Sequence, residues 1–454
     1  MIWEQNTRTI VMLTNLKEGS KTKCHQYWPE SKETYRDITV TTHKTEVFPD
    51  YVIRTFVLKQ ASSQETHNVH HFQFTVWPDK GVPQYATAVL ALRRKVKAKN
   101  PDHAGPVVVH CSAGVGRTGA YIVIDAMLER AKMLKDVDIP NYMASIRNAR
   151  PYMVQTDEQY VFIHLAIYEA FTCGNTEIQA FNLQIAINKL AMVNQQKNAT
   201  GYALEYERLN KVTANYTKDE SDVGQSIENT EKNRYKDNVV LNRSRVLLSR
   251  NNGSNYINAS YVDLNAYKER NAFIVTQAPL QNTIEDFWIM VVDYEVGTIV
   301  MLNALEEHCP EYWPQNGCTT YGLVTVELQD SQTIGELISR RFSVNYNSTC
   351  VQVLHLQMLS WADKCVPDNP QSVLDLLNEV EQSQRQTKNA PVVVQCSNGV
   401  GRSGTFCAIS SVVERVKQEQ IIDVFQTVKR IRSNRPGAVE TLVRIVFEFR
   451  VVFV

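Results

Sequence analysis

The chain contains 454 residues, 43% hydrophobic and 21% charged, and its 48 basic residues balance 48 acidic ones. This length predicts two or three domains with substantial cores, and the balanced charge argues against nucleic-acid partners, which favour a basic surplus. No stretch approaches the roughly 20 apolar residues of a membrane span, and nine scattered cysteines without a CxxC pair exclude a disulfide framework and favour reduced thiols.

Hydrophobic periodicity indicates the secondary structure. Apolar runs, several of them alternating with polar residues, predict strands at 9–13, 34–42, 51–59, 70–76 and 106–110. Apolar residues at helical spacing predict helices at 119–134, 158–171 and 404–418. Strands and helices mixed in this order predict an α/β fold, with a twisted mixed β-sheet flanked by helices.

Segments of the first half return in the second half of the chain. PVVVHCSAGVGRTGAY at 106–121 returns as PVVVQCSNGVGRSGTF at 391–406, a separation of 285 residues. TVWPDKGVP at 75–83 returns as LSWADKCVP at 359–367, a separation of 284 residues. TIVML at residue 9 also returns, at residue 298. A repeat at this spacing predicts two tandem copies of one domain.

The two copies differ in length. The second copy carries a block at 233–288 that has no partner in the first, so we expect the first copy to lack its N-terminal third. We place the first domain at 1–172 and the second at 179–454, joined by a short linker at 173–178.

The segment HCSAGVGRTG at 110–119 has the composition of an anion-binding loop. A strand, a glycine-rich turn and a helix start place backbone N–H groups and the positive end of a helix dipole around one point. Such surroundings favour the thiolate of Cys111, the nucleophilic form. Arg117 can bind two phosphate oxygens bidentately, and the Thr118 hydroxyl can hydrogen-bond the sulfur. The backbone of the turn would bind the anion through Ser112, Ala113, Gly114, Val115 and Gly116.

Two plainer interpretations compete. Gly114, Gly116 and Gly119 also satisfy G-x-G-x-x-G, with Asp138 near the distance at which a ribose-binding acid stands. We set a dinucleotide site aside because Asp138 follows a predicted helix instead of ending a second strand. Cys111 could instead be a small buried core residue, but chance rarely places an arginine and a hydroxyl residue at this spacing.

Three further residues would complete a phosphate-transfer site. Asp79, in Trp-Pro-Asp 32 residues before the cysteine, can protonate a leaving group and then activate water; alone it would be a turn former. Gln155 can orient a hydrolytic water, with Gln159 behind it, although a helix-cap role is the plainer interpretation. Glu18 can brace Arg117 or lie in a surface turn.

Together these elements resemble the protein-tyrosine phosphatase family, and in particular the tandem cytoplasmic domains of a receptor-type enzyme. The resemblance covers nearly the whole chain. It rests on the motifs HCSAGVGRTG (110–119), WPD (77–79), KCHQYWP (23–29), MVQTDEQY (153–160), NRYKD (233–237), NYINASY (255–261), TQAPL (276–280) and DFW (286–288).

The resemblance implies a cysteine-loop phosphatase fold and a set of roles. Cys111 would attack phosphotyrosine, Arg117 would bind the phosphoryl group, Asp79 would act as acid and then base, and Gln155 would position water. Glu18 matches the residue that pairs with the loop arginine. No metal and no organic cofactor is implied, and the partners would be phosphotyrosine-containing proteins in signal transduction.

The second copy departs from the family pattern. It keeps Cys396, Arg402, Ser403 and Asp363, and a tyrosine, Tyr235, that in the family packs on the phosphotyrosine ring. It replaces several other positions of the first copy, with Gln395 for His110, Asn398 for Ala113, Ala362 for Pro78, Glu440 for Gln155 and Arg444 for Gln159. Without the proline the acid-bearing loop is less restricted, and a carboxylate at Glu440 would repel a phosphate dianion. We therefore expect an inactive or weakly active regulatory domain.

The leading prediction is a phosphotyrosine-protein phosphatase whose first domain is catalytic. The alternatives are a non-catalytic pseudophosphatase that binds phosphotyrosine or docks a partner domain, and hydrolysis of phosphoinositides or of several phosphoresidues. Redox sensing through Cys111 would be compatible with phosphatase activity, because a low-pKa thiolate oxidises readily. The resemblance implies a cytoplasmic location, as the intracellular part of a single-pass receptor. It also allows contact between the two phosphatase domains, either within one molecule or between molecules.

Overall fold

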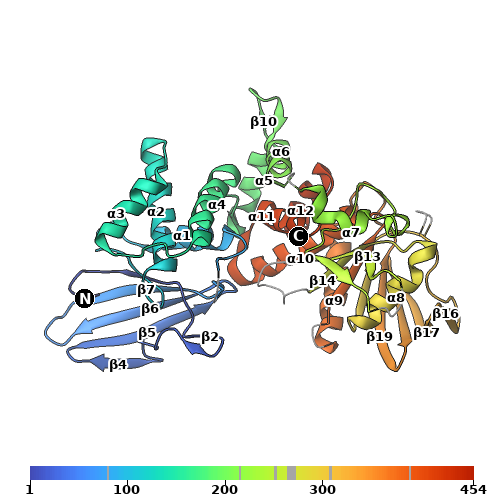
Figure 1. The fold of residues 1–454 in the computed structure, drawn as a ribbon, viewed down its shortest axis with the longest axis horizontal. Helices are drawn as coiled ribbons and strands as arrows, with labels where there is room; N and C mark the ends of the chain where they lie inside the picture. The colour runs from blue at the N-terminus through green and yellow to red at the C-terminus, as the bar shows by residue number, and fades with distance from the viewer. Residues whose placement is uncertain are drawn as a thin grey trace. The chain divides into compact units, whose positions relative to one another are not determined.

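The structure is a computed structural model. It describes residues 1–78, 81–213, 216–249, 253–262, 272–305, 309–387 and 390–453. The chain forms two compact units, Met1–Asn175 and Thr176–Val454 (Figure 1). Within the described ranges, no helix has both the length and the apolar character needed to cross a bilayer.

The first unit is built on a mixed sheet with strand order β4-β5-β6-β7-β1-β8. Strands β4 to β7 pair antiparallel in chain order, whereas β1 runs parallel to both β7 and β8. The strands are β1 (Thr9–Met12), β4 (Lys32–Tyr35), β5 (Ile38–Val47), β6 (Tyr51–Gln60), β7 (Thr66–Phe74) and β8 (Val108–His110), and a separate hairpin joins β2 (Lys17–Glu18) to β3 (Lys21–Thr22). All four residues of β1 are buried, because the strand has a parallel neighbour on each side.

One strand prediction is wrong. Residues 34–42 form two strands instead of one, because the chain reverses between β4 and β5 and pairs Tyr35 with Ile38. Arg36 takes a left-handed conformation, with φ of 58°, to make this turn. The loop residues Arg36 and Asp37 include no glycine, proline or asparagine, so the sequence lacked the usual mark of a tight hairpin.

Helices α1 (Thr87–Lys99), α2 (Gly116–Leu134), α3 (Ile139–Ala149) and α4 (Asp157–Cys173) cover one face of this sheet (Figure 1). Strand residues such as Val11 and Phe72 face the helices and join Ile124 and Ile163 in one buried cluster. Asp138 caps α3 by accepting a hydrogen bond from the Asn141 N–H at 3.2 Å. It therefore sits between two helices and not at the end of a strand, as a ribose-binding acid would.

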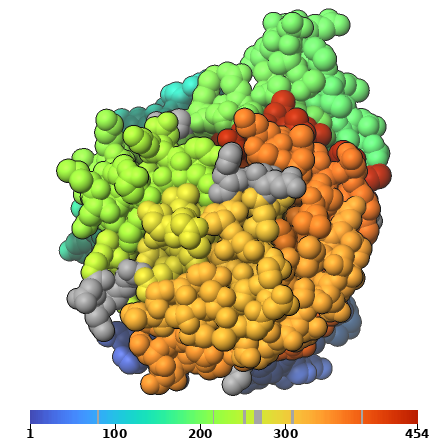
Figure 2. All heavy atoms as spheres, turned by 90° about the vertical axis from the view of Figure 1, so that its right-hand side faces the viewer, coloured from blue at the N-terminus to red at the C-terminus, as the bar shows by residue number. Residues whose placement is uncertain are grey.

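The second unit is built on a longer mixed sheet, with strand order β12-β13-β14-β20-β15-β19-β18-β17-β16. Yellow and orange segments, which carry α8 and the strands from β16 to β19, fill much of one face of this unit (Figure 2). The sheet strands are β12 (Arg245–Leu247), β13 (Tyr256–Val262), β14 (Phe273–Gln277), β15 (Thr298–Met301), β16 (Cys318–Tyr321), β17 (Val324–Ile334), β18 (Leu337–Tyr346), β19 (Thr349–Met358) and β20 (Val392–Cys396).

The helices of the second unit include α10, which follows the cysteine-bearing strand β20 directly. They are α5 (Leu183–Ala191), α6 (Gly201–Thr213), α7 (Asp222–Gln225), α8 (Ile284–Asp293), α9 (Gln371–Gln386), α10 (Gly401–Glu419), α11 (Val424–Asn434) and α12 (Leu442–Phe453). Short strand pairs join β10 (Val193–Asn194) to β11 (Ala199–Thr200) and β21 (Ile421–Ile422) to β9 (Ile178–Gln179).

The internal repeat appears in the topology of both units. Six strands of the second sheet, in the order β16-β17-β18-β19-β15-β20, correspond one by one to the strands β4-β5-β6-β7-β1-β8 of the first sheet. In both units a cysteine follows or ends the strand beside the TIVM strand and precedes a 19-residue helix. The predicted α/β fold, with twisted mixed sheets flanked by helices in two tandem copies, is confirmed.

Candidate active site

The first cysteine loop joins the end of β8 to the start of α2. His110 ends the strand, and Gly116 begins the helix five residues after Cys111. The tight path explains two of its glycines. Gly114 has a φ of 72°, which disfavours side chains, and a Cβ on Gly119 would lie 2.5 Å from the Val154 backbone nitrogen. The loop thus presents backbone N–H groups and the positive end of a helix dipole at its centre.

The Cys111 thiol lies in this centre and is 8% exposed. Burial acts to raise its pKa, but hydrogen bonds outweigh burial and lower the pKa below that of an ordinary cysteine. The lowering comes from the side chain and backbone N–H of Thr118 and from the backbone N–H groups of Gly114 and Val115. The Thr118 hydroxyl is buried and makes no hydrogen bond to another described residue, which leaves it available to the thiolate. The Gly114 nitrogen lies 3.3 Å from Sγ. A lowered pKa increases the fraction of nucleophilic thiolate at neutral pH.

We expect Cys111 to react with iodoacetamide at lower pH than Cys24 of the same unit, because burial raises the pKa of Cys24. The rate at each cysteine can be followed separately by peptide mass spectrometry across a pH series. Thr118→Val removes the hydroxyl and should move the Cys111 midpoint upward, toward that of Cys24. Equal midpoints for Cys111 and Cys24 in the unmodified chain would contradict this account.

Arg117 is held in place by a buried carboxylate. Its Nη1 and Nη2 donate to Glu18 Oε1 and Oε2 at 2.6 and 2.8 Å, and Nη1 also donates to the Leu13 carbonyl at 3.1 Å. Glu18 lies in β2 and is 7% exposed, so it is not a solvated turn residue. Burial acts to raise the Glu18 pKa, but Arg117, the Asn15 N–H and the Thr14 hydroxyl together lower it.

We expect Glu18→Gln to destabilise the first unit at pH 7 by about 2–4 kcal/mol, because it leaves Arg117 largely buried with a neutral partner. A lowered folded-state pKa adds stability above the unfolded-state pKa, and this stability is lost as the pH falls through the folded value. The deficit of the variant should therefore shrink in acid, below about pH 4. Urea unfolding at pH 7 and in acid measures both values, and a deficit independent of pH would contradict the ionic pairing.

The predicted acid, Asp79, lies outside the described residues, but the segments beside it are placed. Trp77 is 2% exposed, donates from Nε1 to the Gly81 carbonyl at 3.3 Å, and packs edge-on against Phe162. Arg117 Nη2 donates to the Pro78 carbonyl at 3.0 Å. A hydrogen bond thus joins Pro78, the residue before Asp79, to Arg117 of the cysteine loop.

Gln155 and Gln159 lie beside the start of α2. Gln155 is exposed, and a Cβ built on Gly116 would lie 3.4 Å from its Cβ. The Gln155 N–H donates to Gln159 Oε1 at 2.9 Å, and Gln159 is buried at the beginning of α4. The structure therefore brings Cys111, Arg117 and Gln155 to one end of α2.

A chain of hydrogen bonds behind the loop was missed by the sequence interpretation. Tyr27 Oη lies 2.9 Å from His71 Nε2 and 2.7 Å from His110 Nε2, and His110 Nδ1 lies 3.1 Å from the Cys111 carbonyl oxygen. Arg54 Nη1 lies 3.5 Å from His71 Nδ1. Residues from β6, β7 and the loop after β3 thereby reach the backbone of the nucleophile.

The donors and acceptors of this chain follow from its two ends. An arginine only donates and a carbonyl only accepts, so His71 Nδ1 accepts and His110 Nδ1 donates. Tyr27 then accepts from His71 and donates to His110, with both rings neutral. Burial, and after it the charge of Arg54, lower the pKa of His71 to about 3, and burial also lowers the pKa of His110. Tyr27 and His71 recur as Tyr312 and His355, bonded at 2.9 Å, which the repeat could have indicated.

The second loop repeats the fold of the first with different contacts. Cys396 is 1% exposed, and its Sγ lies 3.3 Å from the Ser403 hydroxyl. Arg402 is buried and donates to the Trp361 carbonyl at 2.8 Å. Its Nη2 lies 3.5 Å from Asp363 Oδ1, whose side chain is 54% exposed. Arg402 and Asp363 therefore approach each other in the second unit, in the loop region that also carries Cys396.

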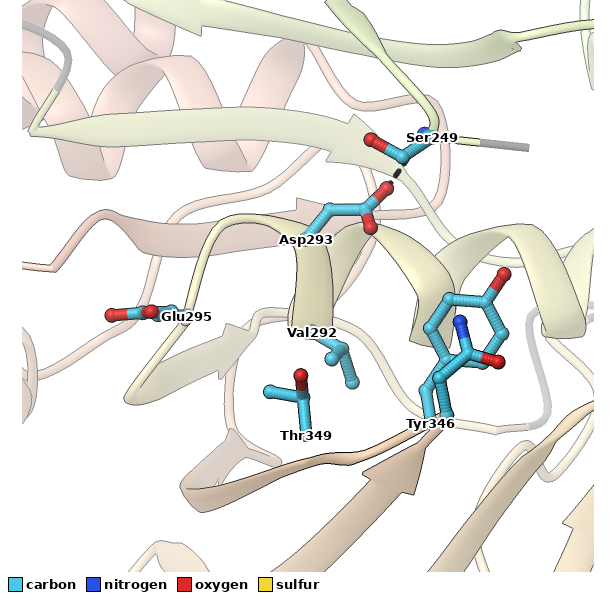
Figure 3. A pocket seen from close by; sticks show the side chains of 7 residues that line it. Ser249, Val292, Asp293, Glu295, Tyr346 and Thr349 are labelled. Carbon is cyan, nitrogen blue, oxygen red and sulfur yellow. Dashed lines mark hydrogen bonds between the residues drawn. The ribbon is translucent and has the colours of Figure 1, made fainter. Parts of the chain in front are cut away.

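A separate pocket of the second unit, about 390 Å³ in volume, holds no comparable chemistry (Figure 3). Inside it the Ser249 N–H donates to Asp293 Oδ2 at 2.8 Å. Its lining contains no cysteine and no cationic side chain: Ser249, Val292, Asp293, Glu295, Tyr346, Asn347 and Thr349. Across the described ranges of the chain, no three or more His, Cys, Asp or Glu side chains cluster as a metal site.

Comparison with known proteins gives a consistent result. The family described as protein-tyrosine phosphatase matches residues 1–169 and 229–453. Similar curated proteins include receptor-type tyrosine-protein phosphatase S of Gallus gallus, 42% identical over 97% of this chain and 30% of that protein. Receptor-type tyrosine-protein phosphatase U of Gallus gallus is 41% identical over 97% of this chain and 32% of its own length. Receptor-type tyrosine-protein phosphatase F of Danio rerio is 42% identical over 97% of this chain and 24% of its own length. The chain thus spans about a third or less of these relatives.

Proposed function

Since the chain belongs to the protein-tyrosine phosphatase family, we propose that its first cysteine loop hydrolyses phosphotyrosine in proteins through a cysteinyl-phosphate intermediate. The observation that carries the proposal is the pairing, in one loop, of a thiol of lowered pKa with an arginine fixed by a buried carboxylate. A thiolate beside an oriented guanidinium suits attack on a phosphate ester, whose charge the guanidinium stabilises. The names of the relatives support tyrosine as the phosphorylated residue.

The first step transfers the phosphoryl group to the enzyme. Cys111 Sγ attacks phosphorus, the bond to the tyrosyl oxygen breaks, and Asp79 donates its proton to that oxygen. The backbone N–H groups from Ser112 to Gly116, together with Arg117, bind the equatorial oxygens. Arg117 keeps its direction because Glu18 holds both of its terminal nitrogens.

The second step returns the enzyme to its starting state. A water oriented by the Gln155 amide attacks the phosphorus of the intermediate, and the Asp79 carboxylate takes its proton. The sulfur–phosphorus bond breaks, and Cys111 leaves as the thiolate. Thr118 stabilises that thiolate through its hydroxyl and N–H, so the same bonds that lower the pKa also make the sulfur a better leaving group.

The division of labour between the units is part of the proposal. Residues 1–172 would form the catalytic domain and residues 179–454 a regulatory domain with little or no activity. The receptor-type relatives support a cytoplasmic role as the intracellular part of a receptor, acting on phosphotyrosine-containing proteins. Contact between the two domains would transmit regulation.

A substrate panel tests the proposal. The full chain is incubated with matched phosphotyrosyl, phosphoseryl and phosphothreonyl peptides and with a soluble phosphoinositide, and released phosphate is measured. The proposal predicts release from the phosphotyrosyl peptide alone. Equal phosphate release from the phosphoinositide would contradict specificity for phosphotyrosine and favour a hydrolase that also acts on phosphoinositides. Binding of the peptide without phosphate release would favour the non-catalytic binding module.

A further inference from the structure

The two cysteine loops differ in where their backbone donors point. In the first loop the N–H groups of Gly114 and Val115 point to the Cys111 sulfur at the centre of the loop. The third residue of that loop is Ala113, whose methyl group offers no acceptor. The centre of the first loop is therefore open to an oxyanion.

In the second loop the third residue is Asn398, and its side chain turns into the loop. Asn398 Oδ1 accepts from the backbone N–H groups of Val400 and Gly401 at 3.1 and 3.2 Å. The Cys396 Sγ lies 3.4 Å from the same oxygen, as its donor. One amide oxygen thus takes two backbone donors that would otherwise face a bound oxyanion, and it accepts from the thiol as well.

Contacts on the other side of Asn398 keep its side chain in this position. Its Nδ2 donates to Glu440 Oε2 at 3.2 Å, and the same carboxylate oxygen lies 3.2 Å from Nη1 of the buried Arg444. The Asn398 carbonyl accepts from Asn238 Nδ2 at 2.7 Å. Glu440 and Arg444 occupy the positions that Gln155 and Gln159 have in the first unit. The residues that differ between the two units at these positions therefore hold the Asn398 side chain in the loop.

From these contacts we propose that the second cysteine loop is a tetrahedral-oxyanion site closed by the side chain of Asn398. The amide oxygen acts as an internal ligand and meets the donors in place of an oxygen of the anion. An entering anion must break those hydrogen bonds, which lowers its affinity for the loop. Removing the side chain opens the site. Alanine fits the position, because Ala113 occupies it in the same strand–loop–helix unit of the first domain.

The test counts anion sites on the full chain by isothermal titration with tungstate. Asn398→Ala is expected to gain one site relative to the unmodified chain, with affinity for that site raised at least about tenfold. The same substitution is also made together with Glu440→Gln, which removes the carboxylate that would face the opened loop. Asn398→Asp is the matched control, because it keeps an acceptor at the same place and should gain no site. Thermal unfolding of each variant confirms that the second unit is folded.

The outcomes are decisive. A site gained by Asn398→Ala in either background, and not by Asn398→Asp, supports the proposal. It is overturned if neither background gains a site, if Asn398→Asp gains one equally, or if the unmodified chain already binds tungstate in both loops. Failure of the proposed catalytic function looks different: the unmodified chain would then release no phosphate from the phosphotyrosyl peptide, while Asn398→Ala would still gain its site.

Discussion

Cys111→Ser is expected to reduce kcat for a phosphotyrosyl peptide by on the order of 10^4-fold or more. A serine hydroxyl is not ionised at neutral pH, and the bonds that lower the pKa of the Cys111 thiol cannot make it so. The serine should still fit the loop, because Cys111 is small and the hydrogen bonds from Gly114 and Thr118 can reach an oxygen. Binding of the peptide should therefore persist while turnover is lost, which a parallel binding titration can verify.

The matched control for Cys111→Ser is Cys396→Ser in the second loop. The centre of that loop is occupied by the Asn398 side chain, so the substitution should leave turnover within about twofold of the unmodified chain. Loss of turnover with Cys396→Ser and retention with Cys111→Ser would assign catalysis to the second unit and contradict the account.

Arg117→Lys is expected to lower kcat/KM by on the order of 10^3-fold. Both terminal nitrogens of Arg117 are oriented by the two Glu18 oxygens, at 2.6 and 2.8 Å, which fixes the plane of the guanidinium. A lysine keeps the positive charge but has one nitrogen, so it cannot hold Glu18 and two phosphate oxygens in that plane. The loss should fall mainly on kcat, because charge builds up on the equatorial oxygens in the transition state.

Arg402→Lys in the second unit is the control for Arg117→Lys and should leave kcat/KM unchanged. A thermal melt of both variants separates a lost contact from an unfolded domain. If Arg117→Lys retained most of its kcat/KM, the bidentate guanidinium would not be the feature that binds the phosphoryl group.

Local pattern and the internal repeat predicted most of the fold. The TIVM strands, the cysteine loops and the helices that follow them recur 284 to 289 residues apart, and each recurs in the same place in its sheet. The one wrong strand, at 34–42, failed because the reversal at Arg36 and Asp37 lacks the Asn-Gly or Asp-Gly pair that marks a tight hairpin. Polar and apolar residues alternate on both sides of this turn. Two charged residues between them do not interrupt the alternation, so hydrophobic periodicity cannot detect the turn.

Long-range polar contacts were harder to predict than the elements. From the sequence, Glu18 could lie in a surface turn or form an ion pair with Arg117. Only the tertiary structure shows that its two carboxylate oxygens accept hydrogen bonds from Arg117. Tyr27, His71 and His110 come from three separate segments, so no local spacing links them. The inward turn of Asn398 is likewise set by Glu440, 42 residues further along the chain. Such contacts depend on side-chain direction, which sequence spacing does not encode.

The most direct test of the central claim, that Cys111 is the nucleophile, is to trap the phosphorylated enzyme. Gln155→Ala should slow the attack of water and let the intermediate accumulate during turnover of a phosphotyrosyl peptide. The mixture is quenched in acid, digested, and searched by mass spectrometry for phosphocysteine. The account predicts the phosphoryl group on the peptide that contains Cys111, and none on the peptide that contains Cys396. A phosphoryl group on Cys396, or turnover with neither cysteine labelled, would contradict it.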